Sequence, residues 1–279
     1  MLATGRTIFW NFFPNSDAMV FEQPLRILIA DDGDLNLLVA SESIRQHFEN
    51  AEVMEATTGK EAIELFEKQD FDLVLMDVQM PEMSGMEAAR YIRLKFQDGK
   101  KHVPIIAITG SDSPAETEEA LASGMDICLC KPVRPYELAL AIAQLLKLQH
   151  AANPSEKKHS EPAEKQSELG FNLVFLRDFC DGDEAQMRYF LQKFAAHYPQ
   201  EVEKLTTALQ NGDRNGMRLA VHSFWPQLVF VGLKNAAEIA DAMEKEIQDG
   251  FREKVLSDLL SDLKYDVEMG LAALKEDWL

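Results

Sequence analysis

Cysteine is scarce in this sequence of 279 residues, which has only Cys128, Cys130 and Cys180 and no Cys-x-x-Cys pair. An odd number without that spacing argues against a disulfide framework or a zinc ribbon and fits a reducing compartment. Basic residues are outnumbered, since 28 Lys and Arg against 47 Asp and Glu give a net charge of −19. That balance speaks against a protein whose main role is to hold nucleic acid or an anionic membrane surface.

Long apolar segments are also missing. No uninterrupted apolar run reaches the length of about 18 residues that a transmembrane helix needs, so we expect no membrane span. Residues 1–22 contain aromatic residues but lack the basic start, continuous apolar core and cleavage site of a signal peptide. Together with the cysteine usage, these absences predict a cytoplasmic protein.

The segment 23–150 alternates short apolar runs with stretches of helical periodicity. Most of the runs lack polar alternation, which is typical of strands buried on both faces of a parallel sheet. The predicted strands are 25–30, 52–56, 73–76, 105–108 and 127–130. The predicted helices are 35–47, 59–68, 85–97, 114–123 and 135–147. This order predicts a doubly wound (βα)5 domain of the α/β class.

The second half of the chain has a different pattern. Residues 151–168 contain Pro, Ser, Glu and Lys but no large apolar residue, so we expect a flexible linker. From 169 to 279 only long helical periods occur, with a predicted N-cap at Asp183 and a kink or break at Pro199. Further turns around Gly212, Gly232 and Gly250 separate four long helices, which predicts an all-α antiparallel bundle.

Polar side chains follow the predicted strands of the first half. Asp31 and Asp32 follow the first strand and Asp77 the third, while Thr109 ends the fourth and Lys131 follows the fifth. Because ligands of such sheets bind at the carboxyl ends of the strands, we expect these side chains to meet. Three converging carboxylates favour Mg2+. A hydroxyl and an ammonium suit phosphoryl oxygens, and a carboxylate can act as the nucleophile.

The segment 25–147 resembles the receiver domain of two-component response regulators, whose fold is flavodoxin-like. The motifs that carry the resemblance are LIADDGDLN (28–36), LVLMDVQMPEMSGMEAAR (73–90), IIAITG (105–110) and GMDICLCKP (124–132). The resemblance implies that Asp77 accepts the phosphoryl group and that Lys131 and Thr109 contact it.

The same resemblance implies a magnesium site. Asp32 and Asp77 would bind Mg2+ directly, Asp31 would bind it through water, and the backbone carbonyl of Gln79 would complete the shell. It also implies a cis bond between Lys131 and Pro132, which is tolerable only before proline. One position departs from the family, because Cys128 replaces the aromatic residue that usually precedes the lysine by three positions. This departure favours a relay receiver over a conformational switch.

About residues 170–279 resemble a histidine phosphotransfer (HPt) domain, with His222 in the place of the phospho-accepting histidine. The resemblance rests on the spacing from His222 to Gly232, the apolar filling between them and the following helix, LKNAAEIADAMEKEI. The family usually has lysine and glycine where this sequence has Trp225 and Pro226. The lost lysine removes a positive charge, and the proline predicts a kink near His222.

Residues 5–14, GRTIFWNFFP, resemble the last strand of a histidine-kinase ATP-binding domain. A disordered leader or an amphipathic strand is the alternative interpretation. If the resemblance is correct, the chain is similar to the C-terminal part of a hybrid histidine kinase. The sequence contains no glycine-rich ATP lid, so we expect phosphotransfer and autodephosphorylation but no kinase activity from it.

These observations predict a protein of a multistep phosphorelay that takes a phosphoryl group from a histidine kinase or another relay protein. Asp77 would accept the group, and His222 would be the relay histidine. Two alternatives stay open: the helical half is a degenerate bundle for docking or dimerisation, or Asp77 is a phosphate sink without onward transfer. The sequence leaves the oligomeric state open.

Overall fold

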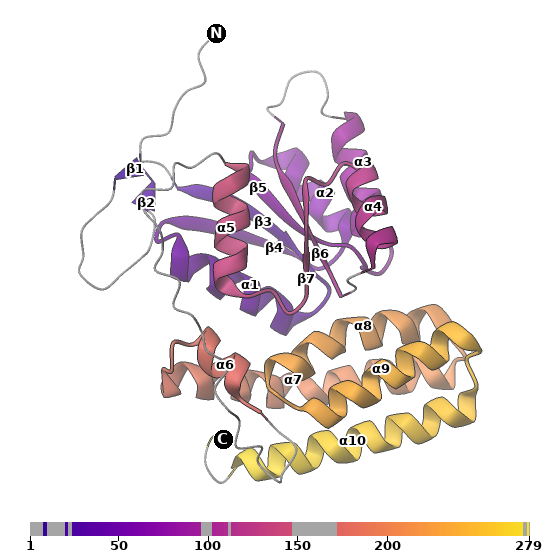
Figure 1. Cartoon of the computed structure of the whole chain (residues 1–279). Coiled ribbons are helices and arrows are strands. Elements are labelled where there is room, and N and C mark those ends of the chain that lie inside the picture. The colour runs from indigo at the N-terminus through magenta and orange to yellow at the C-terminus, as the bar shows by residue number, and fades with distance from the viewer. Residues whose placement is uncertain are drawn as a thin grey trace. The chain divides into compact units, whose positions relative to one another are not determined.

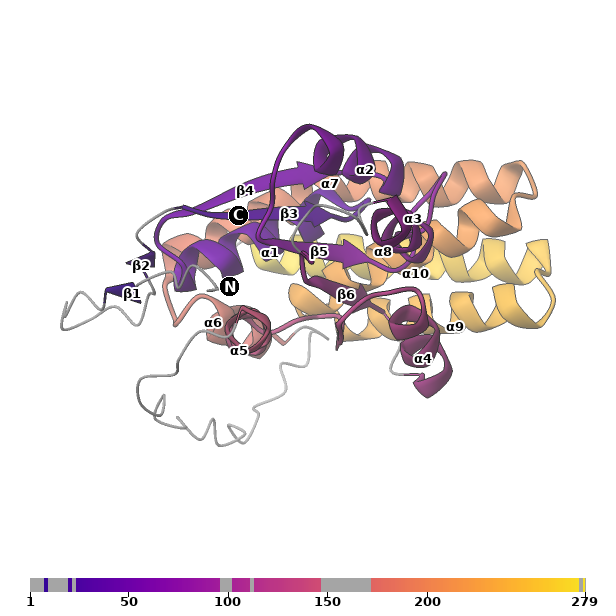
Figure 2. The same cartoon turned by 90° about the horizontal axis from the view of Figure 1, so that it is seen from above.

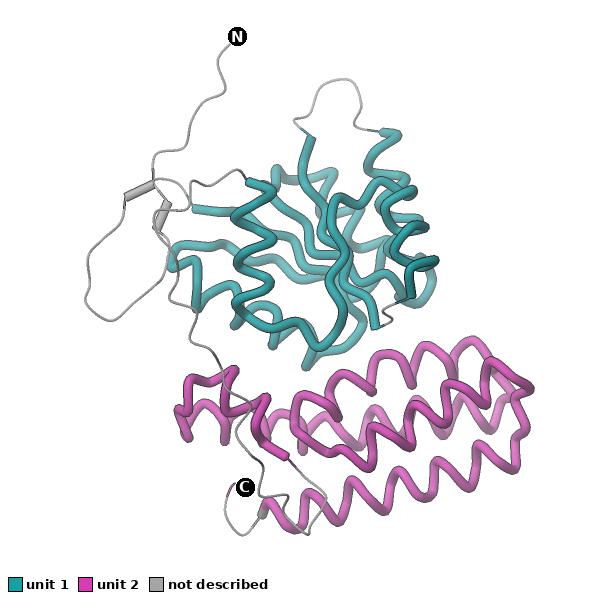
Figure 3. Tube along the Cα trace, in the orientation of Figure 1, with its two compact units in different colours: residues 1–149 teal, residues 150–279 magenta. Residues whose placement is uncertain are grey.

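The computed structural model describes residues 24–95, 102–110, 113–146, 172–275 and 278, and the backbone of two short strands. These strands, β1 (Ile8–Phe9) and β2 (Val20–Phe21), pair antiparallel. The chain divides into two compact units, residues 1–149 and 150–279 (Figure 3). The predicted linker 151–168 lies outside the described residues, as does most of the predicted extension 1–22.

The first unit is built on a five-stranded parallel sheet of order β4-β3-β5-β6-β7 (Figure 1). The strands are β3 (Leu25–Ala30), β4 (Ala51–Ala56), β5 (Leu73–Asp77), β6 (Ile105–Thr109) and β7 (Ile127–Cys130). The central strands are buried because their apolar side chains pack against helices on both faces. The strand order reverses beside β3, so the carboxyl ends of β3 and β5 flank the switch point.

Helices follow the strands and cover both faces of the sheet (Figures 1 and 2). They are α1 (Asp34–His47), α2 (Gly59–Lys68), α3 (Gly85–Lys95), α4 (Pro114–Ala122) and α5 (Pro135–Leu145). Buried residues of α1 and α5 form one apolar core with the sheet, and those of α2, α3 and α4 form the other. The predicted (βα)5 domain is confirmed, with the predicted strand ends correct to within one residue. The predicted ends of two helices, residues 96–97 and 147, lie outside the described residues.

Arg93 on α3 ties together three segments at the amino end of β6. Its guanidinium donates to the carbonyl of Gly124, just after α4, and to the carbonyl of Val103. It also forms an ion pair with Asp126, whose carboxylate accepts the backbone N–H of Ile105 as well. These charge-assisted bonds fix the turn between α4 and β7.

The described part of the second unit is helical. It comprises α6 (Val174–Phe179), α7 (Glu184–Gln210), α8 (Arg214–Phe230), α9 (Lys234–Asp249) and α10 (Glu253–Lys275). The predicted cap at Asp183 is confirmed, since its carboxylate accepts the backbone N–H groups of Ala185 and Gln186. The short helix α6 was not expected from the sequence.

The sequence predicted a kink or break at Pro199, and the break is wrong, because α7 continues through this residue. A proline inside a helix costs about 3 kcal/mol, but buried residues such as Phe194, Tyr198 and Leu205 lie on both sides of it. Tertiary packing of this apolar stripe outweighs the local penalty. Helix α8 likewise continues through Pro226.

The long helices pack in chain order, α7 on α8, α8 on α9 and α9 on α10, and α10 returns to α7. Aromatic rings fill the interior, as where Phe179, Phe190 and Phe230 meet edge to face. The turn between α8 and α9 contains Gly232 at φ 75°. A Cβ there would lie 1.9 Å from the carbonyl oxygen of Asn172, whose N–H donates to the Gly232 carbonyl. Among the described helices, none combines the length and apolar character that crossing a membrane requires.

Candidate functional site

The carboxyl end of the parallel sheet gathers the polar residues that the sequence indicated. Asp31 directly follows β3, Asp77 is the last residue of β5, Thr109 is the last of β6, and Lys131 directly follows β7. All four side chains are buried. They come together because parallel strands bring their carboxyl ends to the same edge of the sheet.

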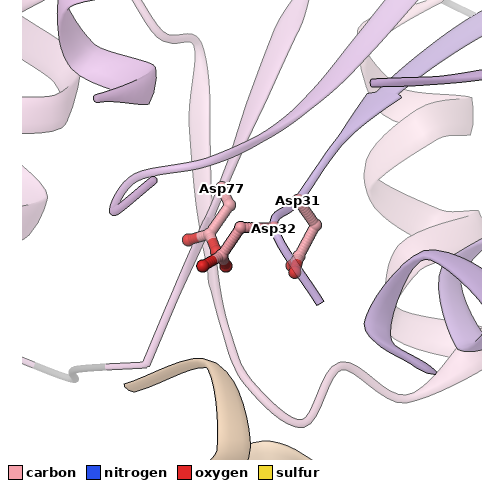
Figure 4. Close-up of side chains that lie close together, drawn as sticks. All are labelled: Asp31, Asp32 and Asp77. Carbon is pink, nitrogen blue, oxygen red and sulfur yellow. The ribbon is translucent and has the colours of Figure 1, made fainter. Parts of the chain in front are cut away.

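Three carboxylates form the centre of this cluster. Asp31, Asp32 and Asp77 each offer an oxygen atom, and these oxygens lie within 4.8 Å of one another. Figure 4 shows the three side chains converging from neighbouring segments. Hard oxygen donors at this spacing suit a divalent cation such as Mg2+.

Lys131 supplies the positive charge of the cluster. Its Nζ lies 2.5 Å from Oδ2 of Asp31 and 2.7 Å from Oδ2 of Asp77, and it donates to both carboxylates. Burial alone would lower the pKa of Lys131, but the charges of Asp31 and then Asp77 raise it, so the ammonium stays charged. The bond from Lys131 to Pro132 is cis, as predicted.

Asp31 is held by neighbours that the sequence did not single out. Its Oδ1 accepts the backbone N–H of Gly33 and the side-chain amide of Asn36, each at 2.9 Å. Burial raises the pKa of the Asp31 carboxyl, and the charge of Asp77 raises it further, while Lys131 acts in the opposite direction. The cluster therefore contains more negative charge than one ammonium balances.

The loop after β5 brings further groups to Asp77. The backbone N–H of Gln79 donates to Oδ1 of Asp77 at 3.1 Å. Gly85 packs so closely that a Cβ there would lie 1.9 Å from the Asp77 carbonyl oxygen. A residue without a side chain is required at this position because backbone atoms stand in the way.

Gln79 also connects the cluster to α4. Its side-chain amide donates to Oε1 of Glu116, in the first turn of that helix, at 3.1 Å. Cys128, at the position where an aromatic residue was expected, packs against the core of α2, α3 and α4, with its Sγ 3.9 Å from the Thr117 carbonyl oxygen. Burial and the charge of Glu116 raise the pKa of its thiol. The bond from Gln79 to Glu116 was not predictable from the sequence, because it joins residues far apart in the chain.

His222 belongs to the second unit and lies in the middle of α8. Its side chain is 5% exposed. Trp225 and Pro226 follow on the same helix, where the HPt family usually has lysine and glycine. Among the described residues, the structure thus assembles the predicted groups of the first unit into one cluster and places the predicted histidine on a separate scaffold.

Comparison with known proteins identifies the first unit. Residues 27–143 match the family described as the response regulator receiver domain. Residues 27–143 are a receiver domain. The parallel sheet of order β4-β3-β5-β6-β7 is therefore the receiver fold, and the acidic cluster lies at its carboxyl end.

Among curated proteins, the chain is similar to sensor protein EvgS of Escherichia coli strain K12, with 26% identity over 261 residues. The match covers 91% of this chain and 20% of EvgS. The receiver part is 36% identical over 120 residues to hybrid signal transduction histidine kinase G of Dictyostelium discoideum, covering 43% of this chain and 4% of that protein. The chain thus spans a fifth or less of the length of these two relatives.

A solved structure is similar to the receiver domain alone. It is the receiver domain of sensor histidine kinase PA1611 from Pseudomonas aeruginosa PAO1, with a magnesium ion coordinated in its active site cleft. Identity is 30%, the match covers 45% of this chain and 99% of that chain, and the TM-score is 0.41.

Proposed function

We propose that this chain is a phosphorelay protein in which Asp77 accepts a phosphoryl group from a phosphohistidine donor. The observation that carries the proposal is the cluster at the carboxyl end of the sheet, where the Lys131 ammonium contacts Asp77 beside two further carboxylates. A buried carboxylate with a cation at 2.7 Å is a nucleophile next to a group that attracts phosphoryl oxygens.

The transfer to Asp77 requires little more than positioning and charge balance. A carboxylate oxygen of Asp77 forms a bond to phosphorus while the P–N bond to the donor imidazole breaks, and the imidazole leaves with the electron pair of that bond. Lys131 would hold one phosphoryl oxygen, and the hydroxyl of Thr109, at the end of the neighbouring strand, would donate to another. The group then leaves Asp77 to water or to a second histidine.

The donor set of the cluster fits Mg2+. One ammonium faces three carboxylates, so a divalent cation would relieve the remaining repulsion, and the ligand atoms offered are hard oxygens. Asp31, Asp32, Asp77 and the carbonyl of Gln79 would hold the ion. When bound, the ion supplies positive charge to the oxygens of the transferred group.

We further propose that residues 169–279 form an antiparallel HPt-like bundle whose His222 exchanges the phosphoryl group with Asp77 or with another receiver. The closed packing of α7, α8, α9 and α10 supports the bundle, and the match to EvgS extends over this region. Because His222 is 5% exposed, transfer requires its imidazole to become accessible to the donor. Partners would be a histidine kinase or another relay protein.

A docking or dimerisation module is the second candidate for the helical unit. The surroundings of Trp225 favour it, since this residue and Asp241 on α9 are neighbours. The pKa of Asp241 is raised by burial and by Glu244, while Trp225 opposes this shift. Three residues after His222 there is thus an indole with a carboxylate beside it, instead of the lysine that would attract a phosphoryl group.

Labelling the full chain with a small radioactive phosphodonor and Mg2+ tests these proposals. The wild type should carry an alkali-labile label on Asp77 and an acid-labile label on His222, and Asp77→Asn should lose the first. His222→Gln should lose only the second, with His197→Gln on α7 as the matched control. Labelling of Asp77→Asn at the wild-type rate would contradict the receiver role.

The same assay separates the alternatives for the helical unit. Absence of acid-labile label from the wild type, also when a second phosphorylated receiver is added, would favour the docking module. Rapid loss of the Asp77 label at the same rate in wild type and His222→Gln would favour a phosphate sink.

A further inference from the structure

Helix α8 continues through Pro226, although this residue lacks the backbone N–H of other helical residues. Proline has no N–H and cannot donate to the carbonyl four residues earlier, which belongs to His222, and its ring presses against that carbonyl. Prolines kink helices for this reason. The turn that carries His222 therefore has one backbone donor fewer than a turn without proline.

The side chain of Gln227 folds back onto this turn. Its Nε2 donates to the carbonyl oxygen of Ser223 at 3.1 Å, across one helical turn. Gln227 and Ser223 are both buried, at 2% and 1% exposure. The amide of an exposed glutamine would bond to water, whereas the buried Nε2 of Gln227 has the backbone of its own helix as its partner.

We propose that Gln227 is a positioning residue for His222. Pro226 cannot donate to the carbonyl of His222, and the side-chain amide of Gln227 donates to the next carbonyl of α8, that of Ser223. This inference rests on the proposed function of His222 as a relay histidine. Ser223 directly follows the histidine, so the bond from Gln227 closes the turn from which the imidazole extends. Phosphoryl transfer depends steeply on alignment, and a shift of about 1 Å can cost orders of magnitude in rate.

The proposal also explains how this chain accommodates its departure from the HPt pattern. A glycine at position 226 would keep its N–H, whereas proline has none. Gln227 would then be needed only because Pro226 is present. The two residues should therefore show coupled effects, and the coupling is measurable.

A double-mutant cycle in the full chain tests this coupling. Gln227→Met keeps the length of the side chain and removes its amide, while Pro226→Ala restores the backbone N–H. Phosphorylated His222→Gln chain serves as the donor, and chains with Asp77→Asn, which retain His222, serve as acceptors. Transfer in trans is then measured at increasing donor concentration.

We expect Gln227→Met to slow transfer at saturating donor about fivefold, the effect of losing one hydrogen bond, without changing the donor concentration for half-maximal rate. In the Pro226→Ala background the same substitution should change the rate less than twofold, since the N–H of residue 226 is back. An equal slowing in both backgrounds would overturn the proposal, because Gln227 would then act independently of Pro226.

A second readout does not depend on transfer. The imidazole signals of His222 in the NMR spectrum of the unphosphorylated chain should shift or broaden with Gln227→Met and should change far less when Pro226→Ala is also present. Imidazole signals that are insensitive to Gln227 in the Pro226 background would refute the positioning role. If wild-type His222 receives no phosphoryl group at all, the proposed function fails, and the NMR cycle still decides the role of Gln227.

Discussion

The two units of this chain carry their candidate chemistry in different ways. In the receiver domain, Asp31, Asp77, Thr109 and Lys131 come from four strand ends, and the topology of the sheet brings them together. In the helical unit, the candidate chemistry depends on one side chain, His222, in the middle of α8. A site assembled by topology depends on contacts between distant segments, whereas a site on one helix depends on the few residues of its own turn.

The difference extends to electrostatics. The receiver pocket holds a buried ammonium between two carboxylates, so its members depend on one another. Around His222 the sequence differs from the HPt pattern at Trp225 and Pro226. The contact described for this turn is the bond from Gln227 to the backbone of the same helix. The predictions that follow probe how far each unit depends on such contacts, beginning with the largest expected effect.

Replacing Lys131 with Met should destabilise the receiver domain by about 3–5 kcal/mol in the absence of Mg2+, since two buried carboxylates lose their partner. Addition of Mg2+ should raise the unfolding midpoint of this variant more than that of the wild type, because the ion supplies the missing charge. Urea unfolding followed by circular dichroism measures both. Lys60→Met on the exposed face of α2 is the control, with less than about 0.5 kcal/mol expected. A loss below about 1 kcal/mol for Lys131→Met would contradict the dependence on paired charge.

In the helical unit the largest expected loss comes from the backbone. Gly232→Ala should cost about 2–4 kcal/mol, since it combines a positive φ with a clash against Asn172. Gly182→Ala is the control, because Gly182 has φ 78° but open space around it. It therefore measures the cost of the positive φ without a clash, which should be about 1–2 kcal/mol.

The receiver counterpart of this change is Gly85→Ala, which meets the Asp77 carbonyl without a positive φ and should cost about 1–3 kcal/mol. It should also slow labelling of Asp77, whereas Gly232→Ala should leave that labelling unchanged. Thermal unfolding and the labelling assay measure these effects. Equal losses for Gly232→Ala and Gly182→Ala would show that the contact with Asn172 is not limiting.

The smallest expected effect concerns pH and the turn between α9 and α10. Glu246 accepts hydrogen bonds from the side chain and then the backbone N–H of Arg252, which lower its pKa from 4.5 to about 2. A carboxyl whose pKa is lowered by folding stabilises the fold at pH values above its pKa in the unfolded chain. This contribution disappears as the pH falls through about 2, the pKa in the folded state. Arg252→Gln should therefore be less stable than wild type at pH 6, with the gap narrowing towards pH 2.

Urea midpoints at several pH values test this expectation. Lys254→Gln, which removes the same charge from the first turn of α10, is the control. A gap between wild type and Arg252→Gln that stays constant from pH 6 to pH 2 would show that the interaction does not depend on the charge of Glu246.

Much of the receiver fold was predictable because its signals are local. Buried parallel strands appear as short apolar runs, and the residues after those runs are the ones that the topology brings together. The bond from Gln79 to Glu116 and the close approach of Gly85 to Asp77 were not predictable, because they depend on atoms that meet only after folding. For the same reason the sequence left open whether Pro199 kinks or breaks the helix, since tertiary packing decides whether α7 continues through this residue. The roles of the individual site residues and the domain boundaries remain predictions.

The two ends of α4 in the receiver domain are held by different contacts. Beyond its carboxyl end, the carbonyl of Gly124 is held by Arg93, which is itself braced by Asp126 and Val103. Its first turn is joined to the loop after β5 by the amide-to-carboxylate bond from Gln79 to Glu116. We therefore expect any displacement of α4 to begin at the end near Asp77 and to pivot on the end near Gly124.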